Sequence, residues 1–177
     1  MHMYKLIKIP DLITLLNLLC GLGCIYYSYL TKFTAAAIFL LICVVFDYLD
    51  GKVARLTKRK GGFGKQLDSL SDIISFGIAP AVFGYILLNT ATNKIFLFVV
   101  LVLFIFAGVL RLARFNIIKI KGHYKGLPIT SSGIIVPILY FINFPLNYFV
   151  YVYLILAVLM VSPIKFKKID IKFKKSK

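Results

Sequence analysis

The sequence predicts an all-α membrane protein with six transmembrane helices, both termini in the cytoplasm and a short N-terminal segment in the membrane interface. Of its 177 residues, 60% are hydrophobic, and the mean hydropathy is +0.91. The apolar residues form long blocks, as a helix needs about 20 of them to cross a hydrocarbon core of ~30 Å. Most lysines and arginines lie between the blocks. We expect one membrane domain, residues 1–164, followed by a basic cytoplasmic tail, residues 165–177.

The six spans are placed, in chain order, at residues 12–31, 34–54, 66–88, 94–114, 128–145 and 147–164. At 1.5 Å per residue each can cross the hydrocarbon core, the last two only just. The first span follows Lys5 and Lys8, as in a signal peptide, but it is longer than a signal core and lacks a small-residue cleavage site. Before it, MYKLIKIPDL mixes cations with apolar residues, which is typical of a segment lying in the interface.

The positive charges predict the orientation. With both termini inside, the cytoplasm receives Lys5, Lys8, the segments 55–65 and 111–125, and the tail, whereas the other side receives only Lys32 and Lys94. The positive charges that make up the net charge of +16 are therefore interpreted as setting the orientation of the spans in the cell membrane. The basic tail is expected either to bind anionic lipid headgroups or to be frayed. A nucleic-acid binder would instead carry a folded basic patch.

The thiols Cys20, Cys24 and Cys43 lie in apolar runs and are predicted to be ordinary buried or lipid-facing thiols.

The acidic residues are concentrated in one part of the chain. All six are aspartates, and four of them, Asp47, Asp50, Asp68 and Asp72, fall within 26 residues. Carboxylates near hydrocarbon are costly and usually functional. Spacings of three and four place each pair on one helix face, and a loop of about ten residues joins the two helices. Ordinary helix-end aspartates paired with nearby lysines or Arg55 are the alternative.

Four neighbouring carboxylates would repel one another, and one or two divalent cations would remove that repulsion. Oxygen ligands favour Mg²⁺, Mn²⁺ or Ca²⁺ over Zn²⁺. Gly51 and Ala54 leave one helix face bare enough for a ligand to approach the backbone. The guanidinium of Arg55 suits phosphate oxygens. The pattern predicts a site for a metal-bound phosphate ester at the membrane surface.

Residues 47–72, DYLDGKVARLTKRKGGFGKQLDSLSD, match the pattern D-x2-D-G-x2-A-R-x8-G-x3-D-x3-D at every position. In this the chain resembles the CDP-alcohol phosphotransferase family. The segments IPDLITLLNLLCGL, QLDSLSDIISFGIAPA, RLARFN and KGLPIT are similar to the branch that makes phosphatidylserine. The resemblance covers most of residues 9–137.

The resemblance implies a homodimeric six-helix enzyme whose active site opens to the cytoplasm. It would cleave the pyrophosphate of a CDP-diacylglycerol-type lipid, pass the phosphatidyl group to an alcohol and release CMP. It further implies that the four aspartates hold two divalent ions, Mg²⁺ or Mn²⁺ with Ca²⁺ as a non-productive ligand, and that Asp72 is the general base. The residues implied to line the CDP portion are Gly51, Ala54, Arg55 and Gly64.

The acceptor alcohol is expected to be L-serine. Arg111, Arg114 and Asn116 follow the fourth span and are candidates for binding it, with Lys125 across the loop as a weaker one. Anchoring of the topology is their alternative role. Thr14 and Asn17, polar residues in the first span, are candidates for contacting the nucleotide, with a helix–helix hydrogen bond as the alternative. Ser69 and Ser71 are given no role beyond packing.

Two other functions remain open at this point. Glycerol 3-phosphate or inositol phosphate could replace serine as the acceptor, and a divalent-cation transporter could use the same aspartates. A transporter would be expected to carry acids through the depth of several spans, but spans four to six contain none. The sequence shows no Ser–His or Cys–His pair, so direct displacement is expected. Ester and ether lipids are not distinguished.

Overall fold

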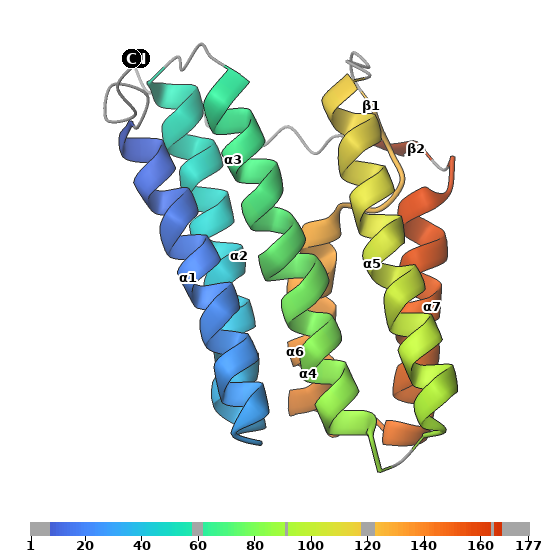
Figure 1. Cartoon of the computed structure of the whole chain (residues 1–177). Helices are drawn as coiled ribbons and strands as arrows, with labels where there is room; N and C mark the ends of the chain where they lie inside the picture. Colours follow the sequence, from blue (N-terminus) through green and yellow to red (C-terminus); the bar gives the residue numbers. More distant parts are fainter. Residues whose placement is uncertain (1–7, 58–61, 91, 118–122, 164, 168–177) are drawn as a thin grey trace.

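The computed structural model describes residues 8–57, 62–90, 92–117, 123–163 and 165–167. Figure 1 shows a bundle of helices that run roughly along one axis. In chain order the elements are α1 (Ile9–Tyr29), α2 (Phe33–Leu56), α3 (Gly62–Asp72), the π-helical η2 (Ile73–Ile78), α4 (Ala79–Leu88), α5 (Lys94–Ile117), β1 (His123–Lys125), the 3-10 helix η3 (Ile129–Ser131), α6 (Ser132–Phe141), α7 (Leu146–Val161) and β2 (Lys165–Lys167). The continuous rod α3–η2–α4 runs between the pair α1–α2 and the pair α5–α7 (Figure 1).

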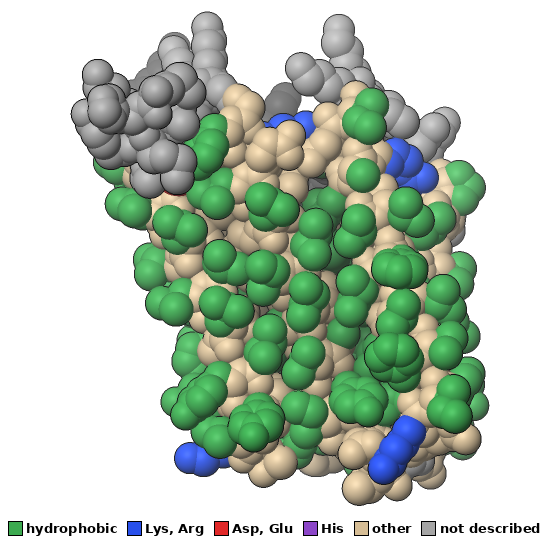
Figure 2. Space-filling model, in the orientation of Figure 1, with side chains coloured by type: hydrophobic (Ala, Val, Ile, Leu, Met, Phe, Trp, Pro, Cys, Tyr) green, Lys and Arg blue, Asp and Glu red, His purple; other side chains and the backbone are tan. Residues whose placement is uncertain are grey.

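The helical class is confirmed, and a helix occupies each of the six predicted segments. Among the described residues, four helical segments are long and apolar enough to cross a membrane: Ile9–Tyr29, Phe33–Leu56, Gly62–Leu88 and Lys94–Ile117. The segments Ile129–Phe141 and Leu146–Val161 are apolar but shorter. Figure 2 shows hydrophobic side chains covering the visible face, with lysine and arginine side chains near its two ends. The count of six spans stays a prediction.

The start of α1 is fixed by a capping contact. The Lys8 N–H donates to Oδ2 of Asp11 at 2.8 Å, and Pro10 occupies the first turn, where its missing N–H costs nothing. Thr31 and Asn143 adopt positive φ angles of 56° and 54° and end α1 and α6 with tight turns. The turn at Thr31 folds α1 and α2 into an antiparallel hairpin.

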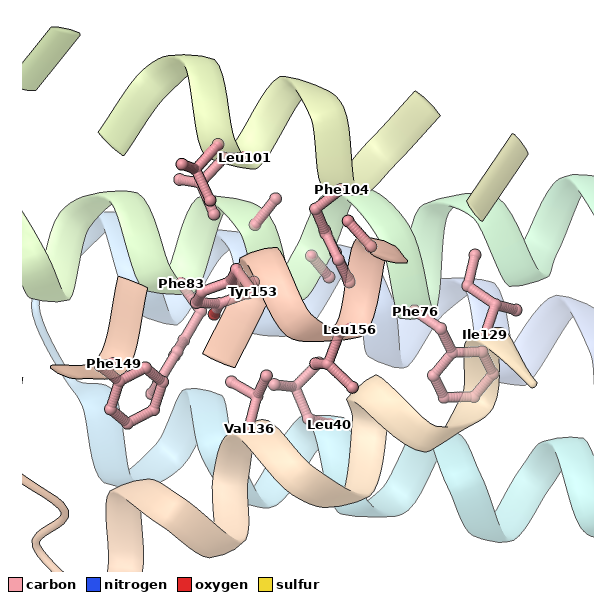
Figure 3. Packing of buried hydrophobic residues seen from close by; sticks show 14 of the residues in the cluster. Leu40, Phe76, Phe83, Leu101, Phe104, Ile129, Val136, Phe149, Tyr153 and Leu156 are labelled. Atoms are coloured by element: carbon pink, nitrogen blue, oxygen red, sulfur yellow. The ribbon is translucent and has the colours of Figure 1, made fainter. Parts of the chain in front are cut away.

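The interior is packed with aromatic and aliphatic side chains, shown in Figure 3. Tyr153 on α7 is fully buried beside Phe104 and Phe149, and its hydroxyl donates to the Pro80 carbonyl at 2.6 Å. Tyr153 fits because Gly84 lacks a side chain: a Cβ there would lie 2.5 Å from its hydroxyl. Small residues that let neighbours approach closely are typical of packed membrane helices.

Pro80 explains the irregular stretch in the middle of the rod. Proline has no N–H to offer the carbonyl of Phe76, four residues earlier, and its ring crowds that carbonyl. The chain widens into η2, where the Ala79 N–H bonds to the Ile74 carbonyl, five residues back. The Ser132 hydroxyl at the start of α6 lies 2.5 Å from the Phe76 carbonyl and 2.7 Å from the Ile129 carbonyl, and it shares its one proton between them. The freed backbone group is therefore satisfied by another helix, as a membrane protein requires.

The connection from α5 to α6 is fastened to the end of α7. The Leu127 N–H donates to the Leu159 carbonyl at 3.0 Å, and β1 pairs with β2 in antiparallel register. The first three residues of the predicted tail, 165–167, thus form part of the fold. The predicted interfacial segment before residue 8 and the tail from residue 168 lie outside the described residues.

Candidate active site and metal centre

The structure brings the four predicted aspartates together. Asp47 and Asp50 lie near the C-terminal end of α2, and Asp68 and Asp72 lie on α3. One carboxylate oxygen from each of Asp47, Asp50 and Asp68 lies within 4.8 Å of the other two. Asp72 is buried next to this group and interacts electrostatically with all three. The spacing argument from the sequence is confirmed for these side chains.

Arg111 on α5 is a buried cation that interacts electrostatically with this group. Its buried side chain interacts electrostatically with Asp47 and Asp72 and lies over the ring of Phe115, 5.5 Å from the ring centre. One guanidinium carries a single positive charge, whereas the four carboxylates carry up to four negative ones. Further positive charge near the carboxylates would therefore stabilise their ionised form.

The donor set fits a hard divalent cation. Carboxylate oxygens are the ligands that Mg²⁺, Mn²⁺ and Ca²⁺ prefer. The group found among the described residues contains oxygen donors alone, with no thiol or imidazole. The three oxygens would have to move only slightly closer together to bind one ion at metal–oxygen distances of ~2.0–2.6 Å. Asp47, Asp50 and Asp68 could hold one ion, and Asp72 lies buried beside them.

A cavity of about 210 Å³ opens beside the carboxylates. Asp50 and Asp68 form part of its wall, so a ligand in the cavity would meet the metal position directly. Elements α1, α2 and α3 contribute to it, and its lining residues are Pro10, Thr14, Asp50, Gly51, Ala54, Gly64, Lys65 and Asp68. Four of the six residues predicted to contact CDP are therefore collected around one space: Thr14, Gly51, Ala54 and Gly64.

Gly51 leaves part of the cavity wall bare. A Cβ built on this residue would meet no atom within 4 Å, so the packing of the described chain does not require glycine here. Glycine in the middle of a helix costs about 0.5–1 kcal/mol relative to alanine. A ligand that approaches the backbone would explain a residue that is otherwise unfavourable at this position.

Comparison with protein families identifies the family of the chain. The model of the family described as CDP-alcohol phosphatidyltransferase matches residues 7–166, which include every element around the cavity. The chain belongs to the CDP-alcohol phosphatidyltransferase family. Enzymes of this family depend on divalent cations, in agreement with the carboxylate group.

Several members of the family are similar to the chain over most of its length. Archaetidylserine synthase of Methanothermobacter thermautotrophicus is 39% identical over 169 residues, which cover 93% of this chain and 71% of that protein. CDP-diacylglycerol–serine O-phosphatidyltransferase of Methanocaldococcus jannaschii is 37% identical over 166 residues, covering 93% and 76%. The Bacillus subtilis protein of the same name is 33% identical over 166 residues, covering 89% of each chain. The chain is thus an enzyme of the branch whose members carry these names.

Two residues predicted to contact CDP lie outside the cavity wall of this phosphatidyltransferase. Arg55 is exposed, and its Nε donates to the Gly51 carbonyl one turn earlier, at 2.9 Å. Asn17 is fully buried in α1, and neither polar atom of its side chain has a hydrogen-bond partner among the described residues. Thr14 does line the cavity, and its hydroxyl donates to Oδ2 of Asp50 at 2.9 Å.

The predicted acceptor residues are separated by the structure. Arg111 interacts electrostatically with Asp47 and Asp72, whereas Arg114 reaches the end of α7 and donates to the Val161 carbonyl at 3.4 Å. The Asn116 side-chain N–H donates to the hydroxyl of Ser69 at 2.9 Å, which joins α5 to α3. The side chain of Lys125, in β1, lies outside the described part of the structure.

Sequence reasoning missed the roles of two residues around the site. Lys65 lines the cavity while its ammonium donates to the Asn116 carbonyl at 3.0 Å. Its position three residues before Asp68, on the same helix face, could have identified it. Ser71, which was given no role beyond packing, donates to the Thr14 carbonyl at 3.1 Å and ties α3 to α1. That contact depends on how the helices pack and has no signal in the sequence.

Proposed function

We propose that the chain transfers the phosphatidyl group of a CDP-diacylglycerol-type lipid, or of its archaeal ether equivalent, to the hydroxyl of L-serine and releases CMP. The observation that carries this proposal is the group of carboxylates at the wall of a cavity that is also lined by the bare backbone of Gly51. The names of the relatives, which are serine phosphatidyltransferases, support serine as the acceptor.

The CDP portion of the donor lipid would occupy the cavity. Gly51 and Ala54 would let it approach α2, and the ammonium of Lys65 would contact phosphate oxygens as a point charge. Asp50 and Asp68 would hold the pyrophosphate through bound metal. Arg55, which lies one turn from Gly51, would reach the phosphates only after its present hydrogen bond is exchanged.

The chemistry is a direct displacement at phosphorus. Bound divalent ions would neutralise the pyrophosphate and stabilise both the attacking and the leaving oxygen. The serine oxygen forms a bond to the phosphatidyl phosphorus, while the bond to the CMP oxygen breaks and CMP leaves with the electron pair. Asp72 takes the proton of the serine hydroxyl. Its buried Oδ1 has no hydrogen-bond partner among the described residues, which supports this role.

Arg111 is the best candidate for binding the serine carboxylate. It lies beside Asp47 and Asp72, so a serine held by its guanidinium would have its hydroxyl near the proposed base. A guanidinium forms two parallel hydrogen bonds with a carboxylate, which also orients the substrate. Arg114, Asn116 and Lys125 would act less directly, by holding the loop and the end of α5.

We further propose that the chain crosses the cell membrane six times as a homodimer, with the site facing the cytoplasm. The four long apolar helices support a membrane-spanning bundle, and the distribution of lysine and arginine along the sequence supports this orientation. The shorter α6 and α7 would span with help from the flanking turns, since bilayers adapt to short helices at modest cost.

The test is the acceptor dependence of CMP release. The purified protein is given Mn²⁺, CDP-diacylglycerol or its ether analogue, and in parallel L-serine, glycerol 3-phosphate or inositol phosphate. We expect release with serine alone and none from the Asp72→Asn variant. Release with a phosphorylated acceptor and none with serine would reject serine as the substrate.

A further inference from the structure

The hydroxyl of Thr14 on α1 makes a direct hydrogen bond to one of the four carboxylates. Its Oγ1 lies 2.9 Å from Oδ2 of Asp50 on α2, and the two residues are only 2% and 4% exposed. They are 36 positions apart in the sequence, so the contact depends on the packing of α1 against α2. Asp50 is one of the three aspartates whose carboxylate oxygens converge within 4.8 Å. Thr14 therefore contacts this group from a helix that contributes no carboxylate to it.

A second acceptor competes for the same proton. The Thr14 Oγ1 also lies 3.1 Å from the Pro10 carbonyl, one turn earlier in α1, which is the usual partner of a threonine inside a helix. A hydroxyl has one proton and cannot donate it fully to both acceptors. Asp50 is the closer of the two, and a hydrogen bond to an ionised carboxylate is roughly twice as strong as one to a neutral acceptor. The proton therefore goes to Asp50 when its carboxylate is ionised.

The backbone of Thr14 is tied to the other helix of the site. The buried hydroxyl of Ser71 on α3 donates to the Thr14 carbonyl at 3.1 Å. Thr14 is thus joined through its side chain to α2 and through its backbone to α3, the two helices that carry the aspartates. The two bonds involve different atoms of Thr14, so each can be removed without the other.

The hydroxyl is better suited to hold Asp50 than to bind a phosphate. Thr14 lines the cavity next to Asp50. When its proton is donated to Asp50, Oγ1 has lone pairs alone to offer a ligand in the cavity, and phosphate oxygens need donors. The carboxylate of Asp50, by contrast, gains a fixed point. One bonded oxygen resists rotation about the Cβ–Cγ bond and so keeps the lone pairs of the carboxylate in one orientation.

We propose that Thr14 is a positioning residue for Asp50. Its hydroxyl donates to one carboxylate oxygen and holds the carboxylate in the plane in which it meets the metal. The proposal rests on the proposed function in taking Asp50 as a metal ligand. Hydrogen-bond partners that orient metal ligands typically change metal affinity about 10- to 100-fold when they are removed.

The test is the affinity of the full chain for Mn²⁺, measured in detergent without lipid or serine by the electron paramagnetic resonance signal of the free ion. Thr14→Val keeps the shape of the side chain and removes the hydroxyl. We expect this variant to bind Mn²⁺ about 10- to 100-fold more weakly than the wild type. Thr14→Ser should bind within about threefold of the wild type, because its hydroxyl can make the same hydrogen bond.

Two further variants separate positioning from crowding and from packing. Valine places a methyl group against the carboxylate oxygen, whereas alanine does not, so Thr14→Ala should bind Mn²⁺ as weakly as Thr14→Val. Ser71→Ala removes a buried hydrogen bond to the same residue and leaves the Thr14 hydroxyl in place. We expect its Mn²⁺ affinity to change less than about threefold, since orientation of the ligand is retained. Circular dichroism melting without metal confirms that each variant is folded at the temperature of the titration.

Unchanged Mn²⁺ affinity in Thr14→Val and Thr14→Ala would overturn the proposal. An equal loss in Ser71→Ala would also overturn it, because packing of α1 would then be the cause. So would a loss in Thr14→Ser as large as in Thr14→Val, or a wild-type chain that binds no Mn²⁺. If the Thr14 variants bind Mn²⁺ weakly, Thr14→Ser restores the affinity and the wild type releases no CMP, the proposal stands and the proposed function is rejected.

Discussion

Gly51 connects the shape of one residue to the binding of the donor lipid. Because a Cβ at this position meets no atom of the described chain, Gly51→Ala should fold normally and should gain about 0.5–1 kcal/mol from helix propensity. The added methyl group projects into the space proposed for CDP. We expect the KM for the CDP-lipid to rise at least tenfold while the melting temperature stays the same or increases, as measured by CMP release and circular dichroism.

Gly62→Ala provides the matched control. A Cβ on Gly62 also meets nothing within 4 Å, but Gly62 does not line the cavity. The KM of Gly62→Ala for the CDP-lipid should therefore stay within twofold of the wild-type value. Equal effects of the two substitutions on KM would mean that Gly51 is needed for the backbone and not for the ligand.

Arg111 and Arg114 test the acceptor site, because they lie three residues apart and have different partners. Arg111→Gln should lower kcat/KM for serine about 10- to 100-fold, corresponding to the loss of a charged hydrogen bond worth about 1.5–3 kcal/mol. Arg114→Gln removes a contact with the end of α7 and should change this ratio less than threefold. Serine titrations with both variants measure the difference, and a larger loss in Arg114→Gln would place the acceptor elsewhere.

At the residue scale, the sequence predicted the side chains whose spacing is local. The four aspartates could be grouped because helix periodicity and one short loop determine their proximity. The hydrogen-bond partners of Arg114 and Asn116 could not be predicted, because they depend on how α7 and α3 are placed relative to α5. Asn17 was recognised as a polar residue among leucines, but its complete burial follows only from how the helices pack.

At the scale of elements, the hydrogen bond from the Ser132 hydroxyl to the Phe76 carbonyl holds the rod against α6. Ser132→Ala would leave the buried Phe76 carbonyl without the hydroxyl that now donates to it. We expect a loss of about 1–3 kcal/mol in the free energy of unfolding, the usual cost of an unsatisfied buried group. Thermal unfolding in detergent measures it.

The neighbouring Ser131→Ala is the control for this prediction, since Ser131 is less buried than Ser132. It should lower the stability by less than about 0.5 kcal/mol, as is usual for substitutions away from buried contacts. If Ser132→Ala is no less stable than Ser131→Ala, the Phe76 carbonyl has another partner.

The helices themselves were predictable, because long apolar blocks and the turns between them are local features. The ends differ from the predicted spans by a few residues, as in α1, which begins at Ile9 where Lys8 and Asp11 cap it. The π-helical stretch η2 was not predicted. Pro80 signals a disturbance, but its form depends on a hydroxyl from α6, more than fifty residues away.

At the scale of the whole molecule, the orientation in the membrane is testable by labelling. In a chain without the three native cysteines, Lys32→Cys and Ile142→Cys place thiols at the turns after α1 and α6, and Thr57→Cys places one after α2. All three positions are exposed. We expect an impermeant maleimide to label the first two in intact cells and the third only after permeabilisation. Protection of Ile142→Cys in intact cells would contradict a sixfold crossing.

The most direct measurement of the central claim is the dependence of catalysis on metal. The purified chain is stripped with EDTA, given CDP-lipid and L-serine, and titrated with Mn²⁺ or Mg²⁺ while CMP release is followed. Because the carboxylates of Asp47, Asp50 and Asp68 converge on a common point, we predict no release before metal is added, full recovery afterwards, and no recovery in Asp68→Asn at the same concentration. CMP release that persists in EDTA, or that survives in Asp68→Asn, would contradict the assignment of this group as the metal-dependent catalytic centre.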